Sequence, residues 1–158
     1  MRERLAAESD LATVDALTRA AYAHYVALLG REPMPMGEDY ASRIAAGEIW
    51  LLEELGDTLG LIVLEDDGDS LTIFSIAIAP QHQHHGLGRR LLAFAESEAR
   101  RRGAGALKLY TNAKMTRNIA IYARAGFVET GRMENSKRPG WIRVDMEKTL
   151  AAEERRQA

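Results

Sequence analysis

The most informative absence in this sequence is cysteine. None of the 158 residues is a cysteine, which excludes disulfide frameworks, zinc sites built on thiolates and cysteine nucleophiles. Also missing are an apolar run long enough to span a membrane and, in the first residues MRERLAAESD, the apolar stretch of a signal peptide. We therefore expect a cytoplasmic protein with no membrane partner.

An excess of positive charge is missing as well. Lys and Arg number 21 against 23 Asp and Glu, a formal net charge of -2, so no overall positive field attracts a nucleic-acid backbone and no nucleic-acid partner is expected. Only four prolines occur, and 46% hydrophobic with 28% charged residues is typical of a globular chain. This length predicts a single domain over residues 1–150 and a solvated tail at 151–158. A homodimer is left open.

The spacing of apolar residues predicts an α+β fold. Helical spacing occurs over 11–29, 39–46, 87–102 and 115–125, with Ser9 and Asp10 as candidate caps of the first helix. Strand-like runs occupy 48–54, 58–65, 70–79, 106–112, 127–133 and 141–148. A turn at Gly56-Asp57 and another at 66–69 separate the first three runs, which favours an antiparallel meander. We expect a mostly antiparallel sheet with helices on both faces.

A strand, a proline and a glycine-containing loop precede the helix that begins near Leu87. The loop has the sequence QHHGLGR at residues 83–89. Two glycines at this spacing let the backbone turn tightly and approach a ligand, and the N–H groups of a helix N-terminus attract phosphate oxygens. A glycine pair between strand and helix is also found as a plain turn, so both interpretations stay open. A Walker sequence is excluded because Arg89-Arg90 follows Gly88, and a dinucleotide fingerprint because it needs a third glycine.

Two motifs together resemble the GNAT superfamily of N-acyltransferases. The pattern Q-x-x-G-x-G after a strand ending in Ile-x-Pro resembles that family's coenzyme A motif, and NIAIYARAGF at 118–127 resembles its helix ending in Y-x-x-x-G-F. The resemblance covers nearly the whole chain. It implies a mixed sheet of six to seven strands in which strand 71–79 and the parallel strand 106–112 splay apart in a V that holds acyl-CoA.

The resemblance also implies which residues bind the coenzyme and act on it. Strand residues 76–78 would offer backbone groups to pantetheine and the acyl carbonyl, and residues 84–89 would cradle the pyrophosphate. Tyr122 would protonate the departing CoA thiolate, since a phenol has an ordinary pKa of about 10; its alternative is an aromatic that only packs. The implied coenzyme-binding residues are Ile76, Ala77, Ile78, Gln83, His84, His85, Gly86, Leu87, Gly88, Arg89 and Asn118.

One position departs from the family pattern. Many members have an asparagine seven residues before the tyrosine, where this chain has Met115. Asn118 lies four residues before Tyr122 on the same helical face, so it is a candidate for the pantetheine contact, with a surface amide as the alternative. The general base is not evident, because strand 70–79 has only hydroxyl side chains among its polar residues. A water relay or a residue outside that strand must serve, and the loop candidates are Glu32, Glu38 and Asp39.

The implied function is an enzyme that transfers an acyl group, above all acetyl, from acetyl-CoA to a primary amine of a small molecule. Acetyl-CoA is the co-substrate. No metal is expected, because His82, His84 and His85 lack the i,i+4 helical spacing of a zinc site. Tyr40 and Tyr110 are candidate acceptor-binding residues. The alternatives are a protein or peptide N-acetyltransferase, including a toxin-like one, and a non-catalytic acyl-CoA sensor.

Overall fold

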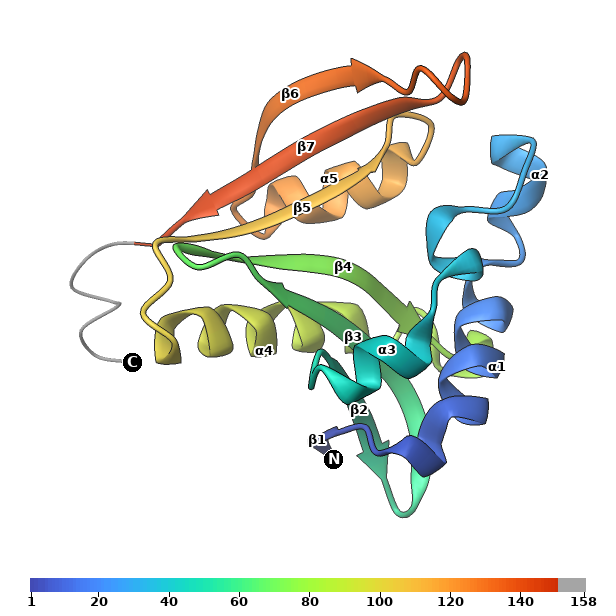
Figure 1. Cartoon of the computed structure of the whole chain (residues 1–158), viewed down its shortest axis with the longest axis vertical. Helices are drawn as coiled ribbons and strands as arrows, with labels where there is room; N and C mark the ends of the chain where they lie inside the picture. The colour runs from blue at the N-terminus through green and yellow to red at the C-terminus, as the bar shows by residue number, and fades with distance from the viewer. Residues whose placement is uncertain (151–158) are drawn as a thin grey trace. The chain divides into compact units, whose positions relative to one another are not determined.

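A computed structural model describes residues 1–150 (Figure 1). Seven strands form one sheet in the order β1-β2-β3-β4-β5-β7-β6, mostly antiparallel, with β4 and β5 as a parallel pair. The strands are β1 (Arg2–Leu5), β2 (Ile49–Glu54), β3 (Asp57–Asp66), β4 (Ser70–Ile78), β5 (Ala106–Asn112), β6 (Val128–Glu134) and β7 (Ile142–Thr149). The helices are α1 (Leu11–Tyr22), α2 (Tyr25–Leu29), α3 (Tyr40–Ala45), α4 (Leu87–Arg101) and α5 (Thr116–Arg124), with 3-10 turns η1 (Glu8–Asp10), η2 (Met34–Gly37) and η3 (Pro80–His82). The expected α+β class and mixed sheet are confirmed.

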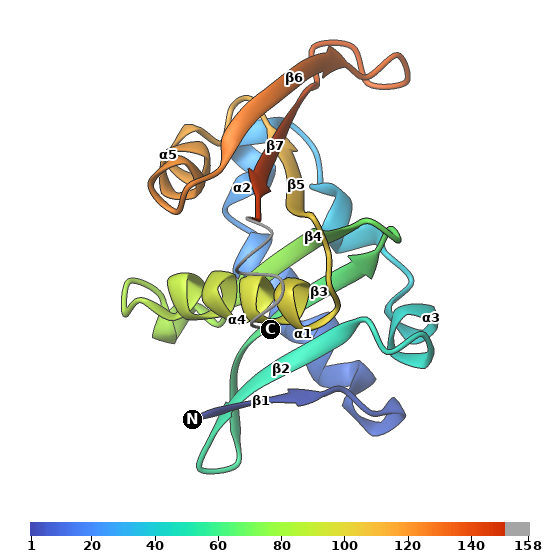
Figure 2. The same cartoon turned by 90° about the vertical axis from the view of Figure 1, so that its left-hand side faces the viewer.

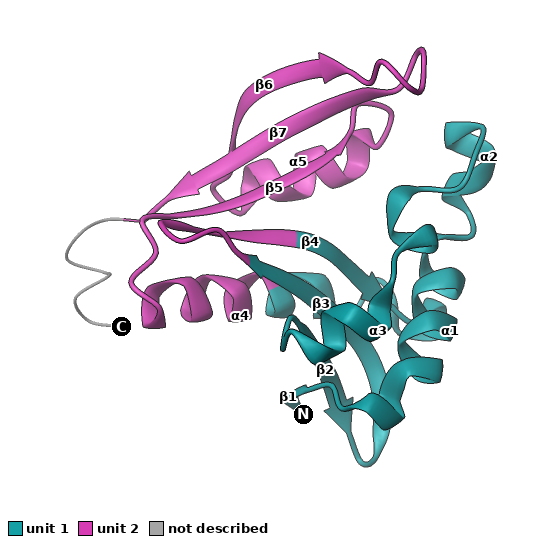
Figure 3. Ribbon diagram, in the orientation of Figure 1, with its two compact units in different colours: residues 1–65, 74–91 teal, residues 66–73, 92–158 magenta. Residues whose placement is uncertain are grey.

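The chain forms two compact units (Figure 3). Unit 1 comprises residues 1–65 and 74–91, and unit 2 comprises residues 66–73 and 92–158. The division passes through β4 and through α4. The single domain expected over residues 1–150 stays a prediction, and the expected solvated tail at 151–158 lies outside the described residues.

The core of unit 1 is centred on β2 and β3. Residues 59–64 of β3 are all buried, and Leu51 and Leu52 of β2 are fully buried. Successive side chains of a strand point to opposite faces, so an uninterrupted buried run means that both faces are covered. Gly60 lies in this run, and a Cβ atom there would come within 2.9 Å of the Ala77 carbonyl oxygen. Glycine at position 60 therefore lets β3 and β4 approach closely.

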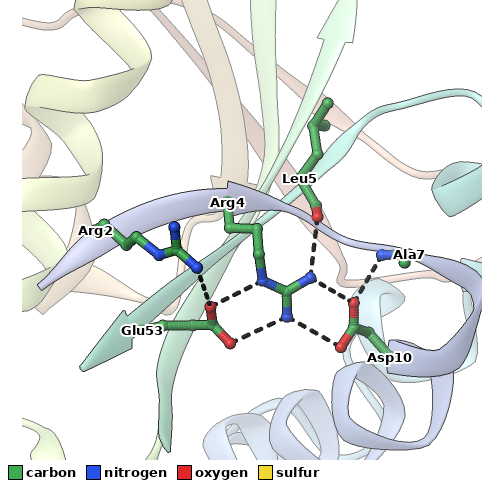
Figure 4. A network of polar contacts seen from close by, with 6 residues as sticks. All are labelled: Arg2, Arg4, Leu5, Ala7, Asp10 and Glu53. Carbon is green, nitrogen blue, oxygen red and sulfur yellow. Dashed lines mark hydrogen bonds and ion pairs between the residues drawn. The ribbon is translucent and has the colours of Figure 1, made fainter. Parts of the chain in front are cut away.

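Strand β1 was not expected, because its sequence RERL has no apolar alternation. Arg4 holds it in place: Nε donates to Glu53 Oε1 at 2.8 Å and Nη1 donates to Asp10 Oδ2 at 2.9 Å (Figure 4). Asp10 Oδ2 also accepts the Ala7 N–H at 2.7 Å. Asp10 thus stands at the N-cap of α1 without bonding that helix, and Ser9 lies within η1, which corrects their expected capping role. Hydrogen bonds from Arg4 hold the pKa of Asp10 and of Glu53 below the ordinary range.

The helix predicted over residues 11–29 is two helices. Helix α1 ends at Tyr22, and α2 begins at Tyr25 and ends before Gly30, whose φ of 79° is the left-handed conformation that glycine adopts most readily. Helix α3, which the sequence predicted over residues 39–46, follows Asp39, whose carboxylate accepts the Ser42 N–H at 3.2 Å. Helix α1 packs against α3 and η2.

The β2–β3 hairpin turns at Leu55 and Gly56, one residue earlier than predicted. Both residues have positive φ, 52° and 84°, which is the conformation of a two-residue type I′ turn. The Leu55 side chain is 99% exposed. Leu55 therefore contributes nothing to the core.

Unit 2 contains β5, β7 and β6 together with the first residues of β4. Ser70 pairs with Ala106 and Ile73 with Leu109 in the parallel ladder, which ends there although both strands continue. The V-shaped splay expected beyond that point stays a prediction. Helix α5 lies beside β5, β7 and β6 in both views (Figure 1, Figure 2).

No helix within residues 1–150 combines the length and the apolar character needed to cross a membrane. The cytoplasmic location stays a prediction.

Candidate functional site

The loop with the two glycines connects β4 to α4, as the sequence predicts. Its φ angles are 67° at His84 and 80° at Gly86, so the chain reverses direction just before α4 begins at Leu87. Glycine adopts this left-handed conformation at little cost, which favours it at position 86, whereas His84 adopts it despite its side chain. The first N–H groups of a helix have no partner within the helix. The loop and the start of α4 together therefore form a natural site for an anion.

Gly88 in the first turn of α4 differs from Gly86. Its φ is not positive, and apart from its chain neighbours and the nearby backbone of its own helix a Cβ atom at this position would find no atom of the described chain within 4 Å. Neither backbone conformation nor packing requires glycine here, and a helix loses about 0.5–1 kcal/mol when glycine replaces alanine. A ligand that approaches the backbone of α4 closely would require it. The conformation of the loop favours glycine at position 86, whereas position 88 is open, as positions 37 and 131 are.

The side chains around this loop differ in their contacts. His84, His85 and Arg89 are exposed, and the Arg89 guanidinium makes no hydrogen bond or ion pair with any residue described. Arg90 is already engaged: its Nε lies 2.9 Å from Glu3 Oε1. Arg89 is therefore the arginine of the loop that an anionic ligand can recruit without breaking an existing contact. Leu87 is buried and packs into the protein.

Residues 76–78 at the end of β4 lie immediately before this loop. Ala77 is buried, whereas Ile76 and Ile78 are half-buried. The Tyr22 hydroxyl donates to the Ile76 carbonyl at 2.9 Å, and Gln83 Nε2 donates to the Ile78 carbonyl at 3.1 Å. Gln83 was predicted to bind the coenzyme; its side-chain amide bonds the strand that leads into the loop.

Tyr122 and Asn118 lie on α5 in unit 2, and both are half-buried. The Tyr122 ring meets the buried Phe127 ring edge to face, with centroids 6.1 Å apart. Met115, which stands where the family pattern has asparagine, is buried and lies 3.5 Å through its sulfur from Thr111 Oγ1. Met115 is thus a packing residue at the start of α5, and Asn118 stays the candidate for the amide contact.

The two candidate acceptor-binding tyrosines have different surroundings. Tyr40 is only 3% exposed, and its hydroxyl donates to the Pro35 carbonyl at 2.5 Å. Burial raises the pKa of Tyr40 to about 12. Tyr110 is half-buried, and the Arg143 guanidinium carbon lies 4.5 Å from its ring centroid, held by Asp145 at 2.7 Å. Tyr110 is thus the more exposed of the two tyrosines, and the Tyr40 hydroxyl is bound to the Pro35 carbonyl.

Two of the candidate general bases have structural partners. Glu38 accepts a hydrogen bond from Arg43 Nε at 2.9 Å. Asp39 accepts hydrogen bonds from the side chain and backbone of Ser42, and these lower the pKa of its carboxyl group. A lowered pKa makes a carboxylate a weaker base. Glu32 is exposed, and nothing favours it over a water relay.

Within residues 1–150, no three His, Cys, Asp or Glu side chains lie close enough together to hold a metal ion. Among the described residues, His82, His84 and His85 are part of no such group. That the protein needs no metal stays a prediction.

Two side-chain contacts at the site were not predicted from the sequence. Tyr22 bonds a carbonyl 54 positions along the chain, and no spacing rule links such distant residues. Arg43 places its guanidinium carbon 3.9 Å from the centroid of the Phe74 ring on β4. Both contacts connect helices to β4, and only the folded chain brings these residues together.

Comparison with known families decides the assignment. The sequence model described as the Acetyltransferase (GNAT) family matches residues 14–127. The chain belongs to this family. The match contains both the glycine loop and Tyr122, which agrees with the resemblance found in the sequence.

Individual relatives agree with GNAT membership. The [ribosomal protein bS18]-alanine N-acetyltransferase of Escherichia coli (strain K12) is 41% identical over 61 residues, 39% of this chain and 41% of that protein. The aligned part thus spans about two fifths of this curated relative. The crystal structure of the ribosomal-protein-S18-alanine N-acetyltransferase from Escherichia coli shares the fold, with a TM-score of 0.76, 24% identity and 96% of each chain covered. A putative acetyltransferase from Salmonella typhimurium, solved with its cofactor acetyl-CoA, has a TM-score of 0.71 and 24% identity over 96% of this chain and 94% of that one.

Proposed function

We propose that this GNAT protein transfers the acetyl group of acetyl-CoA to the amino group of a peptide or protein. The observation that carries the proposal is the glycine loop at the start of α4, with Arg89 exposed beside it, inside the segment that the GNAT family model matches. A bacterial relative is named for acetylating an alanine of ribosomal protein bS18. That name favours the peptide acceptor, an alternative in the sequence analysis, over the small-molecule amine that was the main expectation.

The proposal assigns coenzyme binding to the loop and to β4. The N–H groups at the start of α4 and the Arg89 side chain would hold the pyrophosphate, because both supply positive charge and hydrogen-bond donors. Residues 76–78 would contact pantetheine through their backbone, and Asn118 would contribute an amide. A solved relative that contains its cofactor acetyl-CoA supports this choice of donor.

Acetyl transfer to an amine requires a neutral amine, stabilisation of the oxyanion and a proton for the thiolate that leaves. Acetyl-CoA supplies the activated acetyl group. In this proposal the Tyr122 hydroxyl donates the proton to the thiolate. A backbone N–H near Ile78 stabilises the oxyanion. Removal of the amine proton is left to water, since Glu38 and Asp39 are bound to other groups.

The decisive experiment supplies acetyl-CoA together with a set of acceptors and follows free thiol release, with mass spectrometry of the products. The set contains short peptides that begin with alanine, the same peptides with a blocked N-terminus, and small polyamines and amino acids. We expect thiol release and one added acetyl group on the peptides with a free N-terminus. The blocked peptides are the matched control, because they differ only in the reacting amine.

Two results would contradict the proposal. Turnover of polyamines or amino acids without turnover of any peptide would restore the small-molecule interpretation. Binding of CoA without turnover of any acceptor would favour a non-catalytic sensor.

A further inference from the structure

The edge of β4 that faces away from β3 has an unusual pattern of hydrogen bonds in unit 1. The Ala79 N–H donates to the Leu59 carbonyl on β3 at 2.9 Å, and the Ala77 carbonyl lies against Gly60 of β3. Backbone groups of a strand alternate in direction from one residue to the next. Those of Ile76 and Ile78 therefore point away from β3.

The carbonyls of Ile76 and Ile78 on that edge each accept a hydrogen bond from a side chain. Tyr22 at the end of α1 donates its hydroxyl to the Ile76 carbonyl at 2.9 Å. Gln83 in the glycine loop donates its amide to the Ile78 carbonyl at 3.1 Å. Two separate elements, one on each side of β4 in the sequence, thus supply donors to alternate carbonyls of the same edge.

We propose that Tyr22 and Gln83 are positioning residues that mask the Ile76 and Ile78 carbonyls, so that this edge of β4 presents mainly N–H donors. The inference rests on the proposed function, because it concerns how the thioester of acetyl-CoA is recognised. A thioester carbonyl oxygen is attracted by N–H groups and repelled by an unmasked carbonyl oxygen. Free CoA has no such carbonyl. Masking therefore selects acetyl-CoA over CoA, its product.

The test compares the dissociation constants of acetyl-CoA and CoA by calorimetry. We expect Tyr22→Phe and Gln83→Met each to weaken the binding of acetyl-CoA relative to that of CoA by about two- to tenfold, which is the contribution of one neutral hydrogen bond. A general loss of structure would weaken both ligands equally and leave the ratio unchanged. Thermal melting without ligand separately reports whether either variant is unfolded.

Gln83→Lys is the matched control for Gln83→Met. Lysine still donates a hydrogen bond, and its added charge acts on the phosphates of both ligands alike, so the ratio should stay close to that of the original protein. A ratio unchanged in Tyr22→Phe, in Gln83→Met or in both would overturn the inference while leaving the proposed function intact. If the original protein binds neither acetyl-CoA nor CoA, the proposed function itself fails and the masking role falls with it.

Discussion

At the scale of single residues, the Tyr122 hydroxyl is the group to which the proposal assigns proton transfer to the thiolate. Tyr122→Phe keeps the ring and its edge-to-face contact with Phe127, so folding and affinity for acetyl-CoA should survive. The single-turnover rate should fall by about 10²- to 10⁴-fold, the usual contribution of a positioned general acid. Rapid-quench measurement of that rate is the check. An unchanged rate would leave Tyr122 a packing aromatic.

Tyr40 allows a second test at this scale, through pH. Burial raises the pKa of Tyr40 to about 12 from the ordinary value of 10. Between these two pH values the folded protein retains the phenol proton, whereas the unfolded chain loses it. The protonated phenol of Tyr40 makes its full contribution to the free energy of unfolding below about pH 10. This contribution is lost as the pH rises toward 12. We expect the difference in unfolding free energy between the original protein and Tyr40→Phe to shrink from about pH 8 to about pH 11. Urea unfolding measures it, and a constant difference would refute the raised pKa.

The sequence predicted individual site residues only where a motif contains them. The loop at 83–89 and Tyr122 stand in local patterns, and the family match covers both. Tyr22 and Arg43 belong to no pattern, because their partners on β4 are distant in the chain. The packing of Asn118 and Met115 also required the folded helix.

At the scale of elements, a substitution at the start of α4 tests whether CoA binding can be lost while the stability of the fold is kept. Gly88→Ala should leave the unfolding free energy unchanged or raise it by up to about 1 kcal/mol, since alanine favours helices and its Cβ meets no atom beyond its chain neighbours and the backbone of its own helix. Binding of CoA should nevertheless be strongly weakened. Urea unfolding without ligand and calorimetry with CoA give the two quantities.

Gly86→Ala is the control for this prediction. Gly86 has a φ of 80°, so alanine there is strained by about 1–2 kcal/mol and should lower stability as well as binding. If Gly88→Ala binds CoA as well as the original protein does, the glycine loop is a plain turn.

Most elements followed from apolar spacing, with two instructive exceptions. Strand β1 is polar and depends on the Arg4 network with Glu53 and Asp10, which no periodicity shows. The apolar residues over 11–29 keep helical spacing across Ala23 and His24, although α1 ends at Tyr22 and α2 begins only at Tyr25. Spacing identifies which face is apolar but gives no signal for a short interruption.

At the scale of the whole molecule, the two tryptophans offer a test of whether residues 1–150 are one domain. Trp50 lies in unit 1 and Trp141 in unit 2. Variants Trp50→Phe and Trp141→Phe each leave one fluorescent reporter. A single cooperative domain predicts the same urea midpoint from both reporters, once each variant's own stability is fixed by circular dichroism. Different fluorescence and circular dichroism midpoints within one variant would show that the units unfold separately.

The topology of the molecule followed largely from the order of strands and turns. The antiparallel meander of β2, β3 and β4 and the parallel position of β5 agree with the expected sheet. Strand β7 pairs with β6, which directly precedes it in the chain, and with the more distant β5. Apolar pattern alone does not specify which neighbours such closing strands choose.

The Leu55 turn is suited to site-specific labelling and immobilisation of the protein. The side chain projects fully into solvent from a two-residue hairpin, and the rest of the chain contains no thiol. Leu55→Cys would create a single reactive group for a fluorophore or a surface linker, far in sequence from the glycine loop and Tyr122. Attachment through this turn would leave the side chains of the glycine loop and of Tyr122 chemically unmodified.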